Sequence, residues 1–280
     1  MITDNQTNKV YLAEGLKHYM PMCMNLMNTL KAERIPIDIL PRTNSAKYVW
    51  VRDYMPIQIN GTSFLRYVYS PDYLKGYEEY IPNYKGIDKD LKLNCTYTDI
   101  VLDGGNVIKC GHKVIMTDKV LLENNTKFKK NELLATLEKL FEAEVVLIPW
   151  DRYDEYGHAD GMVRYIEGNR VLLNNYVDFD PYLRKRLLAA LTPHFEVEEL
   201  HYDTPPVSKY SRAYINFLQT EKCIFVPGLR IKEDLLAMEQ IQRFYPNHKV
   251  IRIDDCQDLV RDGGVLNCVS WNIKTQVEPN

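Results

Sequence analysis

The chain has 280 residues, and its 38 acidic side chains slightly outnumber its 35 Lys and Arg side chains, which gives a formal net charge of -3. Hydrophobic residues make up 45% of the chain and charged residues 26%, a composition typical of a globular protein with a large core. Long basic runs are absent, which argues against nucleic-acid binding. No stretch reaches the roughly 18 apolar residues of a membrane span, so no membrane association is expected.

The N-terminal segment MITDNQTNKV lacks an apolar run after a basic start, so we expect no signal peptide and a cytoplasmic location. The six cysteines are scattered singly without a C-x-x-C pair, which argues against zinc ribbons and thioredoxin-like motifs. In a reducing compartment they should be free thiols. No metal or organic cofactor is expected.

Strand-like and helix-like segments interleave along the chain. In chain order the pattern predicts a helix over 129–141, strands over 145–148 and 171–173, a helix over 181–191, a strand over 223–226, a helix over 231–244 and a strand over 250–253. This interleaving favours an α/β or mixed α+β fold. There is no Pro/Gly/Ser-rich linker and no break in composition, so we expect one domain over residues 1–280.

Five short polar clusters stand in or beside the strand-like segments. Their markers are Asp53, Asp103, His158, Asn216 and Cys268, and successive markers are 50, 55, 58 and 52 residues apart. A period near fifty residues is typical of stacked or radial repeats, each of which could deliver one polar residue to a shared axis. The residues between the markers are not visibly similar, so spacing alone does not separate a repeat from coincidence.

If the clusters meet, they bring a thiol and an imidazole together with carboxylates. A thiol beside a histidine is a nucleophile with a proton shuttle, but nearby carboxylates oppose thiolate formation because like charges raise the thiol pKa. A bound cation would remove this obstacle. A guanidinium group is planar and binds carboxylates bidentately, so the cluster favours attack on the central carbon of a guanidinium substrate.

The neighbouring residues suggest how such a substrate would be held. His158 and Asp160 are two residues apart, and on a strand both would face the same side. The glycine pairs at 104–105 and 263–264 would let the backbone approach a ligand, and Trp50 could offer an aromatic face to a cation.

Taken singly, these clusters have ordinary structural interpretations. A glycine pair is usually a turn, an Arg-Asp pair a surface ion pair, and a lone cysteine part of the core. The acidic loop of Asp151, Asp154 and Glu155 is either solvated or a rim that attracts cationic substrates. The joint, ordered occurrence of the clusters is what indicates an enzyme.

The segments WVRDYMPI, LDGGN, GHADGMV, YINF and DGGVLNC resemble the ordered motifs of agmatine deiminases and bacterial-type peptidylarginine deiminases. These belong to the guanidine-modifying superfamily. The resemblance implies a pentein fold, a β/α propeller of five ββαβ-like modules with pseudo-fivefold symmetry around a central site. It also implies that Cys268 is the nucleophile, that His158 is the acid and base, and that Asp53 and Asp160 hold the guanidinium.

Further site residues follow from the same motifs. Asp103 matches a glutamate of agmatine deiminases, and Asn216 an asparagine that lines the peptidylarginine site. The other residues expected to bind substrate are Trp50, Arg52, Gly104, Gly105, Asn106 and Gly264. Two departures are visible. Asp103 is a methylene shorter than glutamate, and GGVLNC replaces the usual GGNIHC, so that Val265 and Asn267 stand in place of polar residues.

The expected function is therefore hydrolysis of a guanidine C–N bond, with agmatine converted to N-carbamoylputrescine and ammonia through a thiouronium adduct on Cys268. The alternatives are deimination of free, C-terminal or peptidyl arginine, amidino transfer, and non-catalytic guanidine binding. The sequence leaves open the substrate's tail and whether the protein forms a homo-oligomer. A substrate carboxylate would need a cation, for which the candidates are Arg42, Arg66, Arg152, Arg164 and Arg212.

Overall fold

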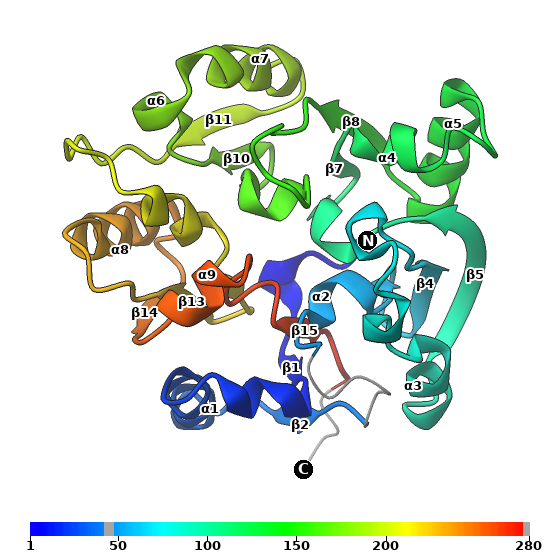
Figure 1. The fold of residues 1–280 in the computed structure, drawn as a ribbon, viewed down its shortest axis with the longest axis horizontal. Helices are drawn as coiled ribbons and strands as arrows, with labels where there is room; N and C mark the ends of the chain where they lie inside the picture. The colour runs from blue at the N-terminus through cyan, green and yellow to red at the C-terminus, as the bar shows by residue number, and fades with distance from the viewer. Residues whose placement is uncertain (42–47, 277–280) are drawn as a thin grey trace.

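The computed structural model describes residues 1–41 and 48–276. In these residues the strands form five small sheets of three strands each, arranged in a ring around a central axis (Figure 1). We call the strand of each sheet that lies nearest the axis the inner strand, and the next two the middle and outer strands. In every sheet the inner strand pairs antiparallel with the middle strand, which pairs parallel with the outer strand. The five sheets thus repeat one unit.

Four of the sheets are continuous in sequence. They consist of β3 (Ile57–Gln58), β4 (Ser63–Val68) and β5 (Asn94–Val101); of β6 (Ile108–Cys110), β7 (Lys113–Thr117) and β8 (Glu144–Ile148); of β9 (Val163–Glu167), β10 (Arg170–Leu173) and β11 (Glu196–Glu199); and of β12 (Leu218–Gln219), β13 (Cys223–Pro227) and β14 (Lys249–Ile253). The fifth sheet joins the two ends of the chain and consists of β15 (Ser270–Ile273), β1 (Lys9–Leu12) and β2 (Ile37–Ile39).

Helices link the middle strand of each sheet to its outer strand, because parallel neighbours require a crossover connection. In chain order these are α1 (Met22–Ala32), α3 (Tyr84–Asp90), α4 (Lys119–Glu123), α5 (Lys130–Phe141), α6 (Tyr176–Phe179), α7 (Pro181–Leu191) and α8 (Glu233–Phe244). Two short helices, α2 (Val51–Tyr54) and α9 (Gln257–Arg261), precede inner strands β3 and β15. Each sheet with its helix is a ββαβ module.

The helices and strands predicted from the sequence pattern are present in the structure at the expected positions. Helix α7 has the predicted bounds, because the Asp180 side chain accepts a hydrogen bond from the Leu183 amide at its start. Leu183, Leu187 and Leu191 of this helix are buried at a spacing of four residues. The predicted strands over 145–148, 171–173, 223–226 and 250–253 are β8, β10, β13 and β14.

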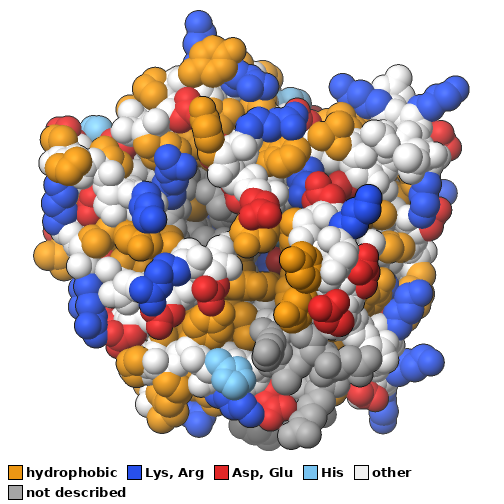
Figure 2. Space-filling view, in the orientation of Figure 1, with side chains coloured by type: hydrophobic (Ala, Val, Ile, Leu, Met, Phe, Trp, Pro, Cys, Tyr) orange, Lys and Arg blue, Asp and Glu red, His pale blue; other side chains and the backbone are white. Residues whose placement is uncertain are grey.

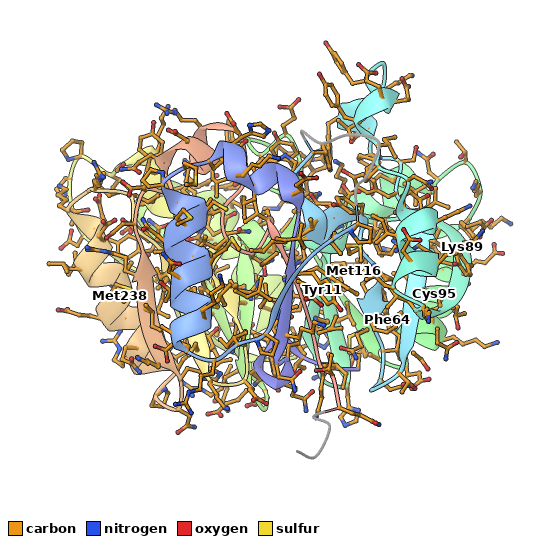
Figure 3. The ribbon with its side chains drawn as sticks, turned by 90° about the horizontal axis from the view of Figure 1, so that it is seen from below. Tyr11, Phe64, Lys89, Cys95, Met116 and Met238 are labelled. Atoms are coloured by element: carbon orange, nitrogen blue, oxygen red, sulfur yellow. The ribbon has the colours of Figure 1, made fainter. Side chains whose placement is uncertain are left out.

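The hydrophobic core of the described residues is shared between neighbouring modules. Buried apolar residues form three clusters rather than one. Seen from the side, Tyr11 and Met116 lie toward the middle of the molecule, whereas Lys89 and Met238 lie on the outer helices α3 and α8 (Figure 3). No helix among the described residues is long and apolar enough to cross a membrane.

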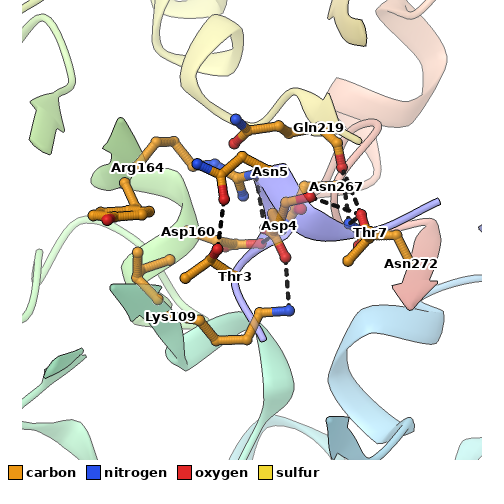
Figure 4. A network of polar contacts seen from close by, with 12 residues as sticks. Thr3, Asp4, Asn5, Thr7, Lys109, Asp160, Arg164, Gln219, Asn267 and Asn272 are labelled. Carbon is orange, nitrogen blue, oxygen red and sulfur yellow. Dashed lines mark hydrogen bonds and ion pairs between the residues drawn. The ribbon is translucent and has the colours of Figure 1, made fainter. Parts of the chain in front are cut away.

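The axis itself is polar. Every inner strand contributes a buried polar side chain at an equivalent place, and these are Gln58, Lys109, Arg164, Gln219 and Asn272. Asp4, in the 3-10 helix η1 (Asp4–Gln6), lies among them, with its carboxylate 2.7 Å from Lys109 Nζ and 3.1 Å from Arg164 Nη2 (Figure 4). Arg52 Nη1 is 4.0 Å from the same carboxylate. We refer to Asp4, Arg52, Lys109 and Arg164 as the axial cluster.

Candidate active site

The five sequence markers occupy equivalent places in the five modules. Each lies in the segment that leads into an inner strand: Asp53 in α2, Asp103 and His158 directly before the 3-10 helices η5 (Gly104–Asn106) and η6 (Ala159–Gly161), Asn216 directly after η7 (Lys209–Ile215), and Cys268 before β15. The inner strands therefore present all five markers at the same end of the axis. The period near fifty residues is the length of one module.

His158 lies between two carboxylates. Its Nε2 is 2.8 Å from Asp103 Oδ2, and its Nδ1 is 3.6 Å from Asp53 Oδ1. Tyr73 donates a hydrogen bond of 3.2 Å to the same oxygen of Asp103, and the Gly105 amide donates one of 3.2 Å to Asp53. Although Asp103 is a methylene shorter than glutamate, it reaches the imidazole.

The Cys268 thiol lies beside a carboxylate and an amide. Its Sγ is 3.7 Å from Asp160 Oδ2 and 3.3 Å from Asn216 Oδ1, and that amide oxygen also accepts a bond from the Cys268 backbone N–H. The Asn267 amide donates a bond of 2.7 Å to Asp160 Oδ2. Asn267, noted in the sequence as a departure, therefore orients the carboxylate next to the thiol.

This arrangement shifts the pKa values of the reactive groups. Burial raises the pKa of the Cys268 thiol well above its usual value, and Asp160 and Asp53 raise it further. Burial also raises the pKa of Asp53 to about 7. For His158, burial alone would lower the pKa, but Asp53 and Asp103 outweigh it and raise the pKa to about 10. Without substrate the site thus holds a neutral thiol and an imidazolium.

A pocket of about 270 Å³ opens at this end of the axis. Figure 2 shows the hollow near the middle of this face. Cys268, His158, Asp160 and Asn216 line the pocket, and its other lining residues include Asp151, Asp154, Tyr156, Tyr176, Phe179, Lys209 and Arg212. Asp53 and Asp103 are not among the lining residues and lie behind His158.

The glycines of the recognised motifs pack closely against protein groups, and Gly264 also lines the pocket. A Cβ at Gly105 would lie 2.7 Å from both Asp53 Oδ1 and His158 Nδ1, and one at Gly264 would lie 2.5 Å from the Trp50 ring and 3.0 Å from Cys268 Cβ. A Cβ at Gly104 would lie 2.0 Å from a backbone oxygen of Arg52. These glycines let the segments of the site approach one another.

Several predicted site residues contact protein groups outside the pocket. Arg52 donates to the Asn267 carbonyl at 3.3 Å and to the Asn272 side chain, and it belongs to the axial cluster. Asn106 accepts a bond of 2.8 Å from the Thr117 amide and so holds its own module together. Like these two, Trp50 does not line the pocket.

One local prediction was wrong. His158 and Asp160 do not lie on a strand. His158 has extended backbone at the start of η6, and Asp160 lies inside that short helix. The turn separates their contacts, since His158 faces Asp103 and Asp160 faces Cys268.

Sequence reasoning missed two residues that contact the site. Tyr73 bonds to Asp103, and Tyr156 lines the pocket. Arg212, which the sequence offered as a candidate cation, also lines the pocket. Tyr156 stands two residues before His158, a proximity that could have drawn attention to it. Tyr73 comes from the crossover of another module, and no motif surrounds it.

Comparison with known proteins identifies the family. The model of the Porphyromonas-type peptidyl-arginine deiminases matches residues 2–273, almost the whole chain. The chain belongs to this family. The resemblance inferred from the five motifs is thereby confirmed.

Individual relatives are more distant. A putative agmatine deiminase of Mycoplasma capricolum subsp. capricolum is 25% identical over 209 residues, which cover 62% of this chain and 57% of the relative. The agmatine deiminase of Medicago truncatula is 24% identical over 210 residues, covering 61% of this chain and 56% of that protein. The matched part thus spans little more than half of these relatives.

Solved structures show the same fold. A putative peptidyl-arginine deiminase has a TM-score of 0.79 at 17% identity, with 99% of this chain and 98% of that chain covered. The C. jejuni agmatine deiminase with substrate bound has a TM-score of 0.78 at 17% identity, with 98% and 96% covered. The predicted pentein fold of five modules is confirmed.

Proposed function

We propose that this chain hydrolyses a guanidine C–N bond, with agmatine as the preferred substrate and ammonia and N-carbamoylputrescine as products. One observation carries the proposal. A thiol lies 3.7 Å from a carboxylate in a pocket that it shares with an imidazole held between two further carboxylates. This combination supplies a nucleophile, a proton shuttle and counter-charges for a guanidinium.

The first half of the reaction uses the charge of the substrate. The guanidinium binds next to Asp160, offsets its charge and so lowers the pKa of the adjacent Cys268 thiol. The thiol loses its proton to solvent, and the thiolate attacks the guanidinium carbon. The C–N bond then breaks, and His158, an imidazolium at neutral pH, donates its proton to the departing nitrogen, which leaves as ammonia. A cationic thiouronium adduct remains on Cys268.

The second half regenerates the enzyme. The now neutral His158 accepts a proton from a water molecule, whose oxygen attacks the adduct carbon. The C–S bond breaks and the sulfur leaves as the thiolate. The added oxygen releases its remaining proton, and the carbon becomes that of a ureido group. His158 has already regained its proton from the water molecule, and the Cys268 thiolate takes up one proton, so both groups return to their resting states.

Agmatine fits the pocket because its distal group is an ammonium. Asp151 and Asp154 line the pocket and offer carboxyl groups to a distal cation, although Asp151 is buried rather than part of an exposed rim. Two relatives named above are an agmatine deiminase and a putative one, which supports the same preference. The test is ammonia release from agmatine, free arginine, guanidinobutyrate and a peptide with C-terminal arginine. Faster turnover of any of the other three would contradict the choice of agmatine.

Deimination of an arginine that carries a carboxylate is the second candidate, and the position of Arg212 favours it. Arg212 is exposed, lines the pocket, and stacks its guanidinium 3.8 Å from the centre of the Phe179 ring. The other candidate cations are engaged elsewhere or not described. Arg66 pairs with Asp88, Arg164 with Asp4, Arg152 stacks on Trp150, and Arg42 lies outside the described residues.

Replacement of this arginine separates the two substrates. If a substrate carboxylate binds Arg212, Arg212→Gln should raise the KM for arginine by about tenfold or more and leave the KM for agmatine unchanged. Arg186→Gln, an exposed position on α7, is the control for the loss of one positive charge. Equal changes for both substrates would remove Arg212 from substrate selection.

Two further alternatives make distinct predictions. Amidino transfer would require an amine acceptor for turnover, and a guanidine-binding protein would bind agmatine without releasing ammonia.

We also propose a cytoplasmic location, because all six cysteines lie among the described residues and carry free thiols, as expected in a reducing compartment. Cell fractionation tests the location, and ultracentrifugation tests for a homo-oligomer.

A further inference from the structure

A buried carboxyl group lies behind the site and has no place in the mechanism above. Glu123, the last residue of α4, has a side chain only 6% exposed, and its Oε1 has no hydrogen-bond partner among the described residues. Its charged neighbour is Lys119, one turn earlier, with Nζ at 3.6 Å. That ammonium makes shorter contacts elsewhere, 2.9 Å to Asp72 and 2.8 Å to the Tyr156 carbonyl. If Glu123 were ionised, its negative charge would therefore have no close positive partner of its own.

Asp103 also has a carboxyl oxygen without a hydrogen-bond partner. Its Oδ2 accepts from His158 and Tyr73, whereas its Oδ1 is buried and has no partner among the described residues. Lys119 connects the two carboxyl groups in space. Its Nζ lies 3.6 Å from Glu123 and 5.0 Å from the centre of the Tyr73 ring, whose hydroxyl bonds to Asp103. Glu123 thus contacts the lysine that lies over the Tyr73 ring, and Asp103 bonds to the hydroxyl of that ring. Each of the two carboxyl groups has one oxygen without a hydrogen-bond partner among the described residues.

Protonation of Glu123 would remove its buried charge and would also supply a hydrogen-bond donor for Asp103, because a neutral carboxyl group is a donor. Burial raises the pKa of Glu123, and Asp103 raises it further, to about 8, although Lys119 and His158 oppose the shift. Asp72 adds a smaller push in the same direction. At neutral pH Glu123 therefore holds a proton.

We propose that Glu123 is a positioning residue that acts through Asp103. Its neutral carboxyl group donates a hydrogen bond to Oδ1 of Asp103, directly or through one water molecule, and leaves Oδ2 to face His158. The donated bond weakens Asp103 as an acceptor and so keeps the imidazolium acidic enough to protonate departing ammonia. When Glu123 ionises, a second negative charge lies behind Asp103, and His158 releases its proton less readily.

The decisive comparison uses Glu123→Gln, Glu123→Ala and a matched control. The glutamine amide can still donate but cannot ionise. We expect the wild-type kcat to fall above pH 8 as Glu123 ionises. Glu123→Gln should retain activity within about threefold at pH 7 and should lose this fall. Glu123→Ala should lose about tenfold in kcat with little change in KM. Glu132→Gln, at an exposed position on α5, should keep the wild-type profile.

A second measurement does not depend on turnover. NMR titration of the His158 imidazole should show its pKa raised by about half a unit or more in Glu123→Ala and near the wild-type value in Glu123→Gln. The inference rests on the proposed function only for its kinetic effects, since a protein without guanidine hydrolysis would still show the titration difference. An unchanged His158 pKa in Glu123→Ala, or an identical pH profile in Glu123→Gln and the wild type, would overturn it. If the alanine variant does not fold, the glutamine pH profile decides alone.

Discussion

Two groups of buried charges share the axis of the ring, and they have opposite excess charge. At the ends of the inner strands, the site gathers Asp53, Asp103 and Asp160 around one histidine. Further along the same strands, the axial cluster gathers three cations around Asp4. The site has an excess of negative charge that a cationic substrate would offset. The cluster has an excess of positive charge and no opening in which we place a ligand.

The two groups are joined by a short chain of contacts. Arg52, next to Asp53 in sequence, donates to the Asn267 carbonyl, and the Asn267 amide donates to Asp160. Each group therefore lies in the electrostatic field of the other, and interactions of this kind are strong where water is excluded. The comparison suggests that the cluster helps the fold to tolerate an acidic site, while the site itself carries the chemistry.

Removal of the nucleophile should have the largest effect and should be confined to the site. Cys268→Ser should lower kcat by roughly 10⁴-fold or more, because serine is a far weaker nucleophile at neutral pH. Agmatine binding should persist, because the carboxylates remain. Calorimetry with the variant measures binding, and ammonia release measures turnover. Asp160→Asn should weaken binding as well as turnover, and substantial turnover by Cys268→Ser would exclude the thiol mechanism.

The next prediction disrupts the axial cluster and leaves the site intact. Asp4→Asn leaves three buried cations without their counter-charge and should lower the free energy of unfolding by about 3–5 kcal/mol. Asp90→Asn, an exposed change at the end of α3, should cost far less. Urea unfolding of both variants at pH 7 measures the difference.

The pH dependence of that difference has a definite sign. Burial alone would raise the pKa of Asp4, but Lys109, Arg52 and Arg164 outweigh it and hold the pKa well below its ordinary range. A depressed folded-state pKa contributes stability above the unfolded value of about 3.9 and loses it as the pH falls below that value. The gap between wild type and Asp4→Asn should therefore narrow below about pH 4. A gap that is constant down to pH 3 would show that Asp4 acts by packing alone.

The same two groups show what the sequence could reveal. The site markers were recognisable because each stands in a polar segment with glycine or other polar neighbours, and the resemblance assigned them roles. The residues of the inner strands, Gln58, Lys109, Arg164, Gln219 and Asn272, are 51, 55, 55 and 53 residues apart, a period just as regular. This period was missed because each of these polar residues stands in or beside an apolar run, where it would normally face solvent.

Contacts between side chains of different modules also could not be predicted from the sequence. Tyr73 and Glu123 reach Asp103 or its surroundings from crossover segments whose lengths and directions only the folded ring determines. Arg52 and Asn106, by contrast, lie inside the recognised motifs and yet contact protein groups away from the pocket. A motif therefore located the site without dividing its residues into those that face the substrate and those that support them.

A methyl group added between the carboxylate and the imidazole should perturb the site more gently. Gly105→Ala places a Cβ 2.7 Å from Asp53 Oδ1 and His158 Nδ1, so both side chains must move. We expect kcat to fall by about 10²-fold, since displacements near 1 Å have effects of this size. Gly61→Ala, between β3 and β4, meets nothing within 4 Å, does not line this pocket and is the control. Equal losses in both variants would point to the backbone instead.

The smallest expected effect concerns the charge preference of the thiol toward reagents. Burial, Asp160 and Asp53 keep Cys268 protonated in the free enzyme, so iodoacetate, an anion, should react slowly. A haloacetamidine carries the planar cation that Asp160 can bind, and it should modify Cys268 about tenfold or more faster than an uncharged haloacetamide does. Peptide mass mapping should find the label on Cys268, and Asp160→Asn should reduce the preference. Because the axial cluster lies outside the pocket, Lys109→Met should leave the preference unchanged if it folds. If Lys109→Met lost the preference and Asp160→Asn kept it, the axial cluster rather than the active site would determine the selectivity. That result would contradict the assignment of the chemistry to the site alone.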